Sequence, residues 1–371
     1  MATETAPANA MLTSAHHIPY WDRDTDQDMV CVDVRSETHD VKTFTFRSRE
    51  DRYFSFMAGQ YFSFDFDIDG RNLNRCYSVS TSSLMPHSIS VTVKRVEGGT
   101  VSNWLHDKLT PGTPVRAMGP SGKFKLDGQP GDKYLFITGG SGITPVMSMV
   151  RTLSDARKYP DIVFFHASRS TKDLIFEDEL RWRAKTTPNF RLFFLPERAD
   201  DAAHAGIAGR VNEALLSMVV PDLAERRIMC CGPAPFMQAV RALSGQLGVP
   251  AHQYFEEDFG GTPQVAPSVA APEAAAPVGP APGVQTFQLH LTKQDKTIAV
   301  ASNEKLLGAM RQAGLHIPSS CGEGECGTCK TKLVSGSVHM EHNGGIRQRE
   351  IDAGFFLPCC STAKEDVVIE R

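Results

Sequence analysis

Four cysteines near the C-terminus have the type and spacing of ligands for an iron–sulfur cluster. Cys321, Cys326 and Cys329 are separated by four and by two residues, and twenty-nine residues lie between Cys329 and Cys359. This C-x4-C-x2-C…C spacing is typical of thiolates that hold a plant-type [2Fe–2S] cluster. The glycines that alternate with the first three cysteines let the backbone turn its amides toward the cluster sulfurs. We therefore expect this end of the chain to carry electrons.

Two other uses of clustered cysteines fit the spacing less well. Zinc sites usually contain two C-x2–4-C pairs, whereas here the fourth cysteine stands apart from the others. A disulfide framework is unusual in a chain of 371 residues without a secretion signal. From spacing alone, Cys360 could replace its neighbour Cys359 as the fourth ligand.

Length and composition limit the class of protein. A chain of 371 residues predicts two to three domains, and a hydrophobic fraction of 41% is ordinary for globular proteins. The net charge of -4 argues against nucleic acid or an anionic membrane as the main partner. The N-terminus resembles no targeting segment, and no apolar run approaches the length that spans a bilayer. We expect a cytoplasmic protein with reduced cysteines.

Composition and periodicity divide the chain into five segments. Residues 1–25 are expected to form a flexible tail, and the Ala/Pro-rich residues 261–284 a semi-extended linker. Residues 26–130 contain short alternating runs separated by turns, which predict an antiparallel β-barrel. In residues 131–260, strands alternate with helices, as in an α/β domain with a parallel sheet. Residues 285–371 predict a hairpin, a helix capped by Ser302-Asn303-Glu304 and the cysteine loop, which fit a small β-grasp domain.

A strand motif in the predicted barrel has residue types that suit a flavin. In Arg75-Cys76-Tyr77-Ser78, the guanidinium offers a fork of donors to a phosphate, and the tyrosine offers an aromatic face to an isoalloxazine. Together with the downstream Gly-Gly-Thr-Val-Ser loop, the motif resembles the flavin-binding signature of the ferredoxin–NADP⁺ reductase superfamily. The resemblance implies that Ser78 lies near flavin N5, where hydride arrives. It also implies that the flavin is lined by Thr92, Val93 and Lys94 and that the pyrophosphate is held by Gly99, Thr100, Val101 and Ser102. Because FMN has no second phosphate for this loop to hold, we expect FAD.

A second motif suits a nicotinamide nucleotide. Gly140, Ser141, Gly142, Thr144 and Pro145 follow a predicted strand and begin a helix, where backbone amides can approach a pyrophosphate. A purely structural tight turn is the alternative. The motif resembles the nucleotide loop of the same superfamily. That resemblance implies that the nicotinamide lies beside Cys231, Gly232 and Pro233 and that Glu257 and Phe259 belong to a closing segment near the flavin. Cys231 is then a packing residue that shapes the hydride path rather than a nucleophile.

The choice between NADH and NADPH depends on two dipeptides after later strands, Ser168-Arg169 and Glu197-Arg198. In relatives specific for NADP⁺, a Ser-Arg pair occupies the second position, whereas here Glu197 replaces the serine. A carboxylate accepts hydrogen bonds from ribose hydroxyls but repels a 2′-phosphate. We therefore predict NADH, and NADPH remains the alternative because either arginine could bind that phosphate.

Residues from about 28 to 371 resemble bacterial reductase components that combine these three sites. Such reductases take hydride from the nicotinamide, and the flavin passes electrons singly to the cluster. The cysteine spacing of the family favours Cys359 over Cys360. Residues 93–107 look most like the reductases of glycine betaine monooxygenases, whose partner is a Rieske-type non-haem iron oxygenase acting on quaternary ammonium compounds. They also look like the NADH oxidoreductase that serves hybrid-cluster proteins, which is the alternative function. Both readings make the chain an enzyme, and two nucleotide-type sites argue against a redox sensor.

The predicted cluster domain has no net charge. Residues 285–371 contain ten basic and ten acidic residues. We therefore expect tethering by the linker, rather than long-range electrostatic steering, to bring this domain to the flavin.

Overall fold

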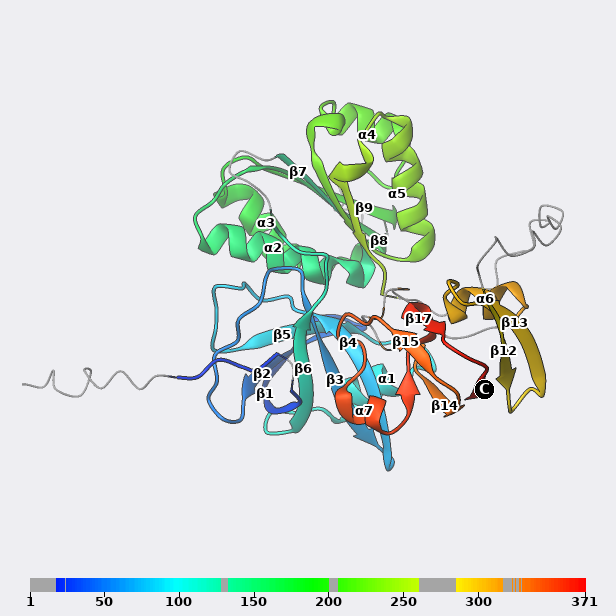
Figure 1. Cartoon of the computed structure of the whole chain (residues 1–371). Coiled ribbons are helices and arrows are strands. Elements are labelled where there is room, and N and C mark those ends of the chain that lie inside the picture. Colours follow the sequence, from blue (N-terminus) through cyan, green and yellow to red (C-terminus); the bar gives the residue numbers. More distant parts are fainter. Residues whose placement is uncertain are drawn as a thin grey trace, which may run out of the picture.

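The computed structural model describes residues 18–23, 25–127, 133–199, 206–259, 285–315, 322, 324, 327 and 329–371. The predicted linker, most of the predicted tail, Cys321 and Cys326 lie outside the described residues. Figure 1 shows the blue and cyan barrel in the middle, the green α/β domain above it and the yellow-to-red C-terminal domain beside it.

The first domain is a six-stranded antiparallel sheet with the strand order β4-β3-β6-β1-β2-β5. An isolated bridge between Val79 and Val91 links the two edges of this sheet and closes the barrel. Phenylalanines alternate along β2 and β3, and Phe44, Phe46 and Phe64 are buried in its core. The elements are β1 (Gln27–Thr38), β2 (Val41–Ser48), β3 (Tyr61–Ile68), β4 (Arg71–Ser78), β5 (Ile89–Lys94), α1 (Thr100–Lys108) and β6 (Pro114–Ser121).

The second domain is a five-stranded parallel sheet with the strand order β11-β10-β7-β8-β9. Phe136 of β7 packs with α2 and α3, whereas its neighbour Ile137 packs with α4 and α5, so helices cover both faces. The elements are β7 (Lys133–Gly139), η2 (Gly140–Gly142), α2 (Ile143–Asp155), β8 (Asp161–Ser170), η3 (Thr171–Asp173), α3 (Glu177–Thr186), β9 (Phe190–Arg198), α4 (Glu213–Val219), η4 (Leu223–Glu225), β10 (Arg227–Cys231), α5 (Ala234–Gln246), η5 (Ala251–Gln253) and β11 (Tyr254–Glu257).

The third domain is a mixed five-stranded sheet with the strand order β13-β12-β18-β14-β16, beside a two-stranded sheet of β15 and β17. The N- and C-terminal strands β12 and β18 pair in parallel at its centre. The elements are β12 (Thr286–Leu291), β13 (Lys296–Ala301), α6 (Leu306–Gln312), β14 (Thr331–Ser335), β15 (Val338–Met340), α7 (Gln348–Asp352), β16 (Phe355–Phe356), η6 (Pro358–Cys360), β17 (Ser361–Ala363) and β18 (Val367–Glu370).

The three predicted types of domain are confirmed, but two local predictions are wrong. The predicted cap of α6 by Ser302-Asn303-Glu304 is wrong. The amide of Ser302 donates to the Gln285 carbonyl and extends the hairpin. The helix therefore begins at Leu306, with Lys305 as its N-cap. The dipeptides Ser168-Arg169 and Glu197-Arg198 do not follow β8 and β9 but lie within their last residues. None of the helices that the structure describes is long and apolar enough to cross a membrane.

Candidate active site

The end of β4 meets the end of β11 through one hydrogen bond. The Ser78 hydroxyl donates to Glu257 Oε2 at 3.0 Å, and Ser78 is buried. Glu257 pairs in register with Cys231 at the end of the adjacent strand β10. Ser78, Cys231 and Glu257 therefore come together from two domains, although Ser78 and Glu257 are 179 positions apart in the sequence. The sequence predicts Ser78 beside the flavin and Cys231 beside the nicotinamide, and the structure brings both next to Glu257.

The loop predicted to bind the nicotinamide nucleotide packs directly against Cys231. Gly142 has ordinary helical backbone angles, yet a Cβ there would lie 2.4 Å from both the carbonyl carbon and the oxygen of Cys231. Gly140 has a φ of +52°, a conformation that favours glycine. Thr144 Oγ1 donates to the Ser141 carbonyl at 3.1 Å and holds the turn. The small residues thus allow a backbone approach that larger ones would block.

Burial disfavours the thiolate form of both cysteines of β10. Burial raises the pKa of Cys231 well above its usual value, and the nearby Glu257 carboxylate adds to the shift. Burial likewise raises the pKa of Cys230 to about 12. A thiol with such a pKa is a poor nucleophile. The predicted packing role of Cys231 fits this environment.

The remaining flavin-strand residues differ in exposure. Arg75 is exposed and donates to the Asn74 carbonyl at 2.7 Å. The half-buried Tyr77 ring packs against Phe64, with ring centroids 6.0 Å apart. The guanidinium is therefore open to a phosphate, while the tyrosine ring is fixed by the barrel core.

On β5, the predicted flavin-lining residues make internal contacts. Thr92 Oγ1 lies 2.8 Å from Thr43 Oγ1, and Val93 is buried in the barrel core. Lys94 forms an ion pair with Asp40 at 2.9 Å.

The predicted pyrophosphate loop begins α1. Thr100 is exposed, whereas Val101 and Ser102 are buried. Ser102 Oγ accepts a hydrogen bond from the Val96 amide at 3.1 Å, and a Cβ at Gly99 would lie 2.7 Å from that oxygen. The loop is thus ordered by its own serine.

On the ribose side, Glu197 has a partner that sequence reasoning missed. Arg210 Nε donates to Glu197 Oε1 at 3.2 Å. Arg169 and Arg198 are exposed, and the buried Ser168 donates to the Ser170 carbonyl at 2.7 Å. Because Arg210 lies thirteen positions from Glu197, no local motif pointed to it.

Further residues complete the nicotinamide side. A Cβ at Gly232 would lie 2.8 Å from the Phe236 ring and 3.0 Å from the Gly139 amide, so this glycine also permits close backbone packing. Pro233 stands at the N-cap of α5. Phe259 is exposed and lies two residues beyond β11.

The described cysteines of the C-terminal domain fit a metal cluster. Cys329 and Cys359 are buried, with their Sγ atoms 3.2 Å apart and no disulfide between them. Two thiolates this close can reach one iron. The Cys360 thiol instead lies 3.5 Å from the Leu357 carbonyl, and a Cβ at Gly324 would lie 2.6 Å from its sulfur. This arrangement favours Cys359 over Cys360 as the fourth ligand.

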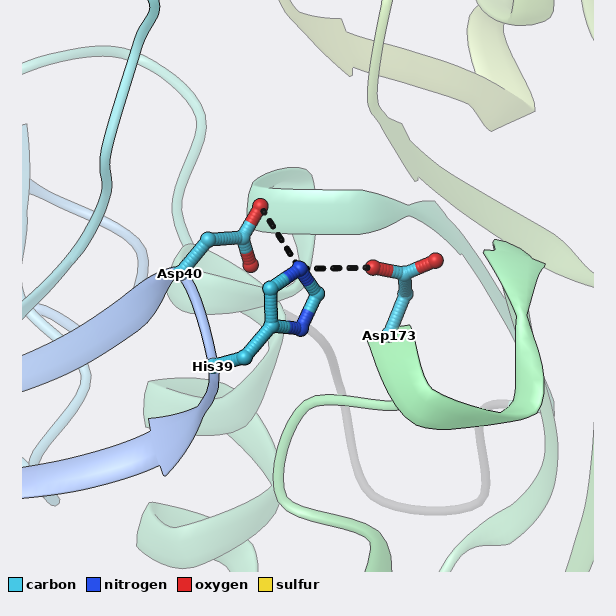
Figure 2. A group of neighbouring side chains, drawn as sticks. All are labelled: His39, Asp40 and Asp173. Atoms are coloured by element: carbon cyan, nitrogen blue, oxygen red, sulfur yellow. Dashed lines mark ion pairs between the residues drawn. The ribbon is translucent and has the colours of Figure 1, made fainter.

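The α/β domain also contacts the barrel away from Ser78. Figure 2 shows His39, in the turn between β1 and β2, between Asp40 and Asp173 of η3, with Nε2 3.9 Å from a carboxylate oxygen of each. Arg151 donates to the Ser80 carbonyl at 2.6 Å. Ser148 donates to the Thr81 carbonyl, also at 2.6 Å. Together these contacts fix the parallel sheet on the barrel.

Known families match each of the three domains. The oxidoreductase FAD-binding domain matches residues 28–126, and the oxidoreductase NAD-binding domain matches residues 136–242. The 2Fe-2S iron-sulfur cluster binding domain matches residues 289–364. The protein is therefore an oxidoreductase that uses NADH, FAD and a [2Fe–2S] cluster, as predicted.

Relatives similar over nearly the whole chain define the family. The glycine betaine monooxygenase reductase subunit of Pseudomonas aeruginosa is 44% identical, over 92% of this chain and 94% of its own. The stachydrine N-demethylase reductase subunit of Rhizobium meliloti is 36% identical, over 92% and 95%. The NADH oxidoreductase HCR of Escherichia coli is 31% identical, over 91% and 95%. The chain belongs to this family of flavin-dependent iron–sulfur reductases.

The same order of domains occurs in a solved structure. Phthalate dioxygenase reductase aligns with a TM-score of 0.55 and 24% identity, over 94% of this chain and 98% of its own. The predicted fold class is confirmed.

Proposed function

We propose that this protein is the NADH-dependent reductase component of a Rieske-type oxygenase system that acts on a quaternary ammonium compound such as a betaine. Two relatives support the substrate class, since one is a subunit of glycine betaine monooxygenase and the other of stachydrine N-demethylase, and both compounds are quaternary ammonium compounds. Electron transfer from NADH through FAD to the cluster fits the three domains.

The structural observation that supports the electron path in this proposal is the hydrogen bond from Ser78 to Glu257 beside Cys231. It holds the Ser78 hydroxyl proton toward Glu257 Oε2 and joins the flavin strand to the nicotinamide strands. The buried thiol of Cys231 excludes water from the same place. FAD, when bound, supplies the conversion between a two-electron donor and a one-electron acceptor. The chain itself contributes orientation and exclusion of solvent.

The assignment of individual residues is part of the proposal. The domain limits are 26–130, 131–260 and 285–371, with the tail 1–25 and the linker 261–284. Reduced thiols for the cluster support a cytoplasmic location. FAD is held by Arg75, Tyr77, Ser78, Thr92, Val93, Lys94, Gly99, Thr100, Val101 and Ser102. NADH is held by Gly140, Ser141, Gly142, Thr144, Pro145, Ser168, Arg169, Glu197, Arg198, Cys231, Gly232 and Pro233, with Glu257 and Phe259 closing the site. The cluster is held by Cys321, Cys326, Cys329 and Cys359.

Anaerobic stopped-flow reduction tests the electron path and the coenzyme. NADH should bleach the flavin first and the cluster second, and NADPH should act more slowly. Faster reduction by NADPH would mean that Arg169, Arg198 or Arg210 binds a 2′-phosphate and that Glu197 does not select NADH. Flavin reduction without cluster reduction would contradict the electron path.

The partner is tested by reconstitution with the purified Rieske-type oxygenase encoded nearest to the gene. NADH consumption should require the oxygenase and glycine betaine or stachydrine together. The alternative is an NADH oxidoreductase that serves a hybrid-cluster protein, supported by the 31% identity to the Escherichia coli NADH oxidoreductase. Turnover with a hybrid-cluster protein and none with the oxygenase would favour that alternative.

A further inference from the structure

Two arginines of the iron–sulfur domain contact two aspartates of the FAD barrel. Arg347 Nη1 lies 3.0 Å from Asp65 Oδ1, and Arg347 Nε pairs with Asp26 Oδ1. Arg349 Nη1 lies 2.8 Å from Asp26 Oδ2, and its Nη2 lies 2.7 Å from Asp65 Oδ2. Each carboxylate is thus shared by both guanidiniums, in a closed cluster of four charges that we call the charge dock.

The charge dock is a built contact rather than a chance surface pair. The side chains of Arg347 and Asp65 are only 5% and 3% exposed, and that of Asp26 is 14% exposed. The Asn74 amide donates to Asp65 Oδ1 at 2.9 Å, which orients the carboxylate from within the barrel. Arg347 Nη2 also donates to the Ser63 carbonyl at 3.3 Å. Planar guanidiniums held this way fix one orientation of the two domains.

The charge dock lies next to the cysteine loop. The Gly324 carbonyl accepts hydrogen bonds from the amides of Asn343 and Gly345, at 3.1 and 2.9 Å. A Cβ at Gly327 would lie 2.4 Å from the Gly345 carbonyl oxygen and 3.9 Å from Asn74 Oδ1 of the barrel. The segment 343–349 therefore connects the cysteine loop to the arginines on one face, which is turned toward the barrel.

The two described cluster ligands are packed in the domain core. Cys329 and Cys359 belong to the apolar core of the domain, together with Leu306, Met310 and Ile369. Electron transfer needs a short path to the cluster, and segment 343–349 contacts Gly324 and Gly327 of the cysteine loop directly.

We propose that this face of the iron–sulfur domain is a docking surface used twice. The barrel occupies it through Asp26 and Asp65 while electrons enter the cluster. An external acceptor protein that presents paired carboxylates occupies it when they leave. Arg347 and Arg349 are positioning residues for both contacts. The inference rests on the proposed function and names the surface chemistry of its partner.

A disulfide can lock the domain in the docked position. A Cβ at Gly344 would lie 3.8 Å from the Ser121 Cβ of the barrel, the usual separation in disulfides. The full-length double variant Ser121→Cys/Gly344→Cys is oxidised with diamide and checked for the cross-link by mass spectrometry. Each single variant is a matched control, since Gly344 has a φ of +92° that strains any other residue.

The probe acceptor is cytochrome b5, an acidic haem protein, under anaerobic conditions. In the locked protein, NADH should still reduce flavin and cluster, but cytochrome b5 reduction should fall to the rate of the Cys329→Ser variant. Dithiothreitol should restore it. Cytochrome b5 reduction at the unlocked rate would overturn the shared surface, and failure of the cross-link to form would overturn the docked arrangement.

Reversing the charges of the charge dock gives a second test, which distinguishes a docking role of the arginines from a merely structural one. Arg347→Glu/Arg349→Glu should slow cluster reduction about tenfold while flavin reduction by NADH is unchanged. Adding Asp26→Arg/Asp65→Arg should restore cluster reduction but not cytochrome b5 reduction, because the outward surface stays acidic. Recovery of neither rate, with a normal cluster spectrum, would refute the charge dock. Loss of flavin reduction by NADH would instead count against the proposed function.

Discussion

Gly142→Ala isolates the close packing between the nicotinamide loop and Cys231. The backbone angles of Gly142 suit alanine, so the only change is a Cβ placed 2.4 Å from the carbonyl of Cys231. Ordinary contact begins at 3.4 Å, and all three atoms that collide, including the Gly232 amide nitrogen at 2.6 Å, belong to the backbone. The loop and the end of β10 must therefore separate by about 1 Å. A displacement of that size at a reacting centre lowers rates by about a hundredfold.

The measurement is the rate of anaerobic flavin bleaching at saturating NADH. Gly245→Ala is the matched control, since Gly245 lies in α5 of the same domain and an added Cβ meets nothing within 4 Å. The control should bleach at the wild-type rate and gain a little stability, because alanine suits a helix better. If Gly142→Ala bleaches as fast as Gly245→Ala, the nicotinamide does not lie against Cys231, and the site must be moved.

Three further predictions concern the flavin contact, the fold and the cluster. Ser78→Ala should keep FAD but slow flavin reduction about tenfold, because Glu257 loses its buried donor; an unchanged stopped-flow rate would contradict the role of this pair. Burial of Glu179 opposes ionisation, but the hydrogen bonds and charges of Arg151 and Arg183 outweigh it and lower its pKa to about 2. Since the folded-state pKa lies below the unfolded value, the ion pair stabilises fully above about pH 4.5 and is lost as pH falls toward 2. Glu179→Gln should therefore cost about 3 kcal/mol in urea unfolding at pH 7 and little near pH 2, and equal losses at both would refute the assignment. Cys329→Ser should abolish the [2Fe–2S] spectrum and leave the flavin reducible by NADH, whereas loss of flavin too would contradict independent sites.

The local motifs predicted the three types of domain. Each motif is a run of neighbouring residues at the end of a strand, so its residue types and spacing can be recognised in the sequence. The loop at Gly142 and the strand before Cys231 are local signals of this kind. The hydrogen bond between Ser78 and Glu257 is different, since it joins residues 179 positions apart. No periodicity or motif spacing encodes such a contact.

The net charge of the iron–sulfur domain also did not reveal its contact with the barrel. The zero net charge of residues 285–371 predicted weak electrostatic steering, yet Arg347 and Arg349 pair with two barrel aspartates. A sum over a domain conceals such pairs because acidic residues elsewhere cancel them. The partner of Glu197 was hidden for a different reason, since Arg210 lies thirteen positions away and belongs to no local motif.

The two interfaces of the barrel differ in physical kind. The α/β domain is held by hydrogen bonds to backbone carbonyls, such as those from Ser148 and Arg151, and by the pairing of His39 with Asp173. The iron–sulfur domain is held by the charge dock, whose released arginines and aspartates would be stabilised by water and counter-ions. The first interface therefore suits a hydride transfer that needs one fixed geometry. The second suits the proposed release of the iron–sulfur domain, because an acidic acceptor surface would compete for the same arginines.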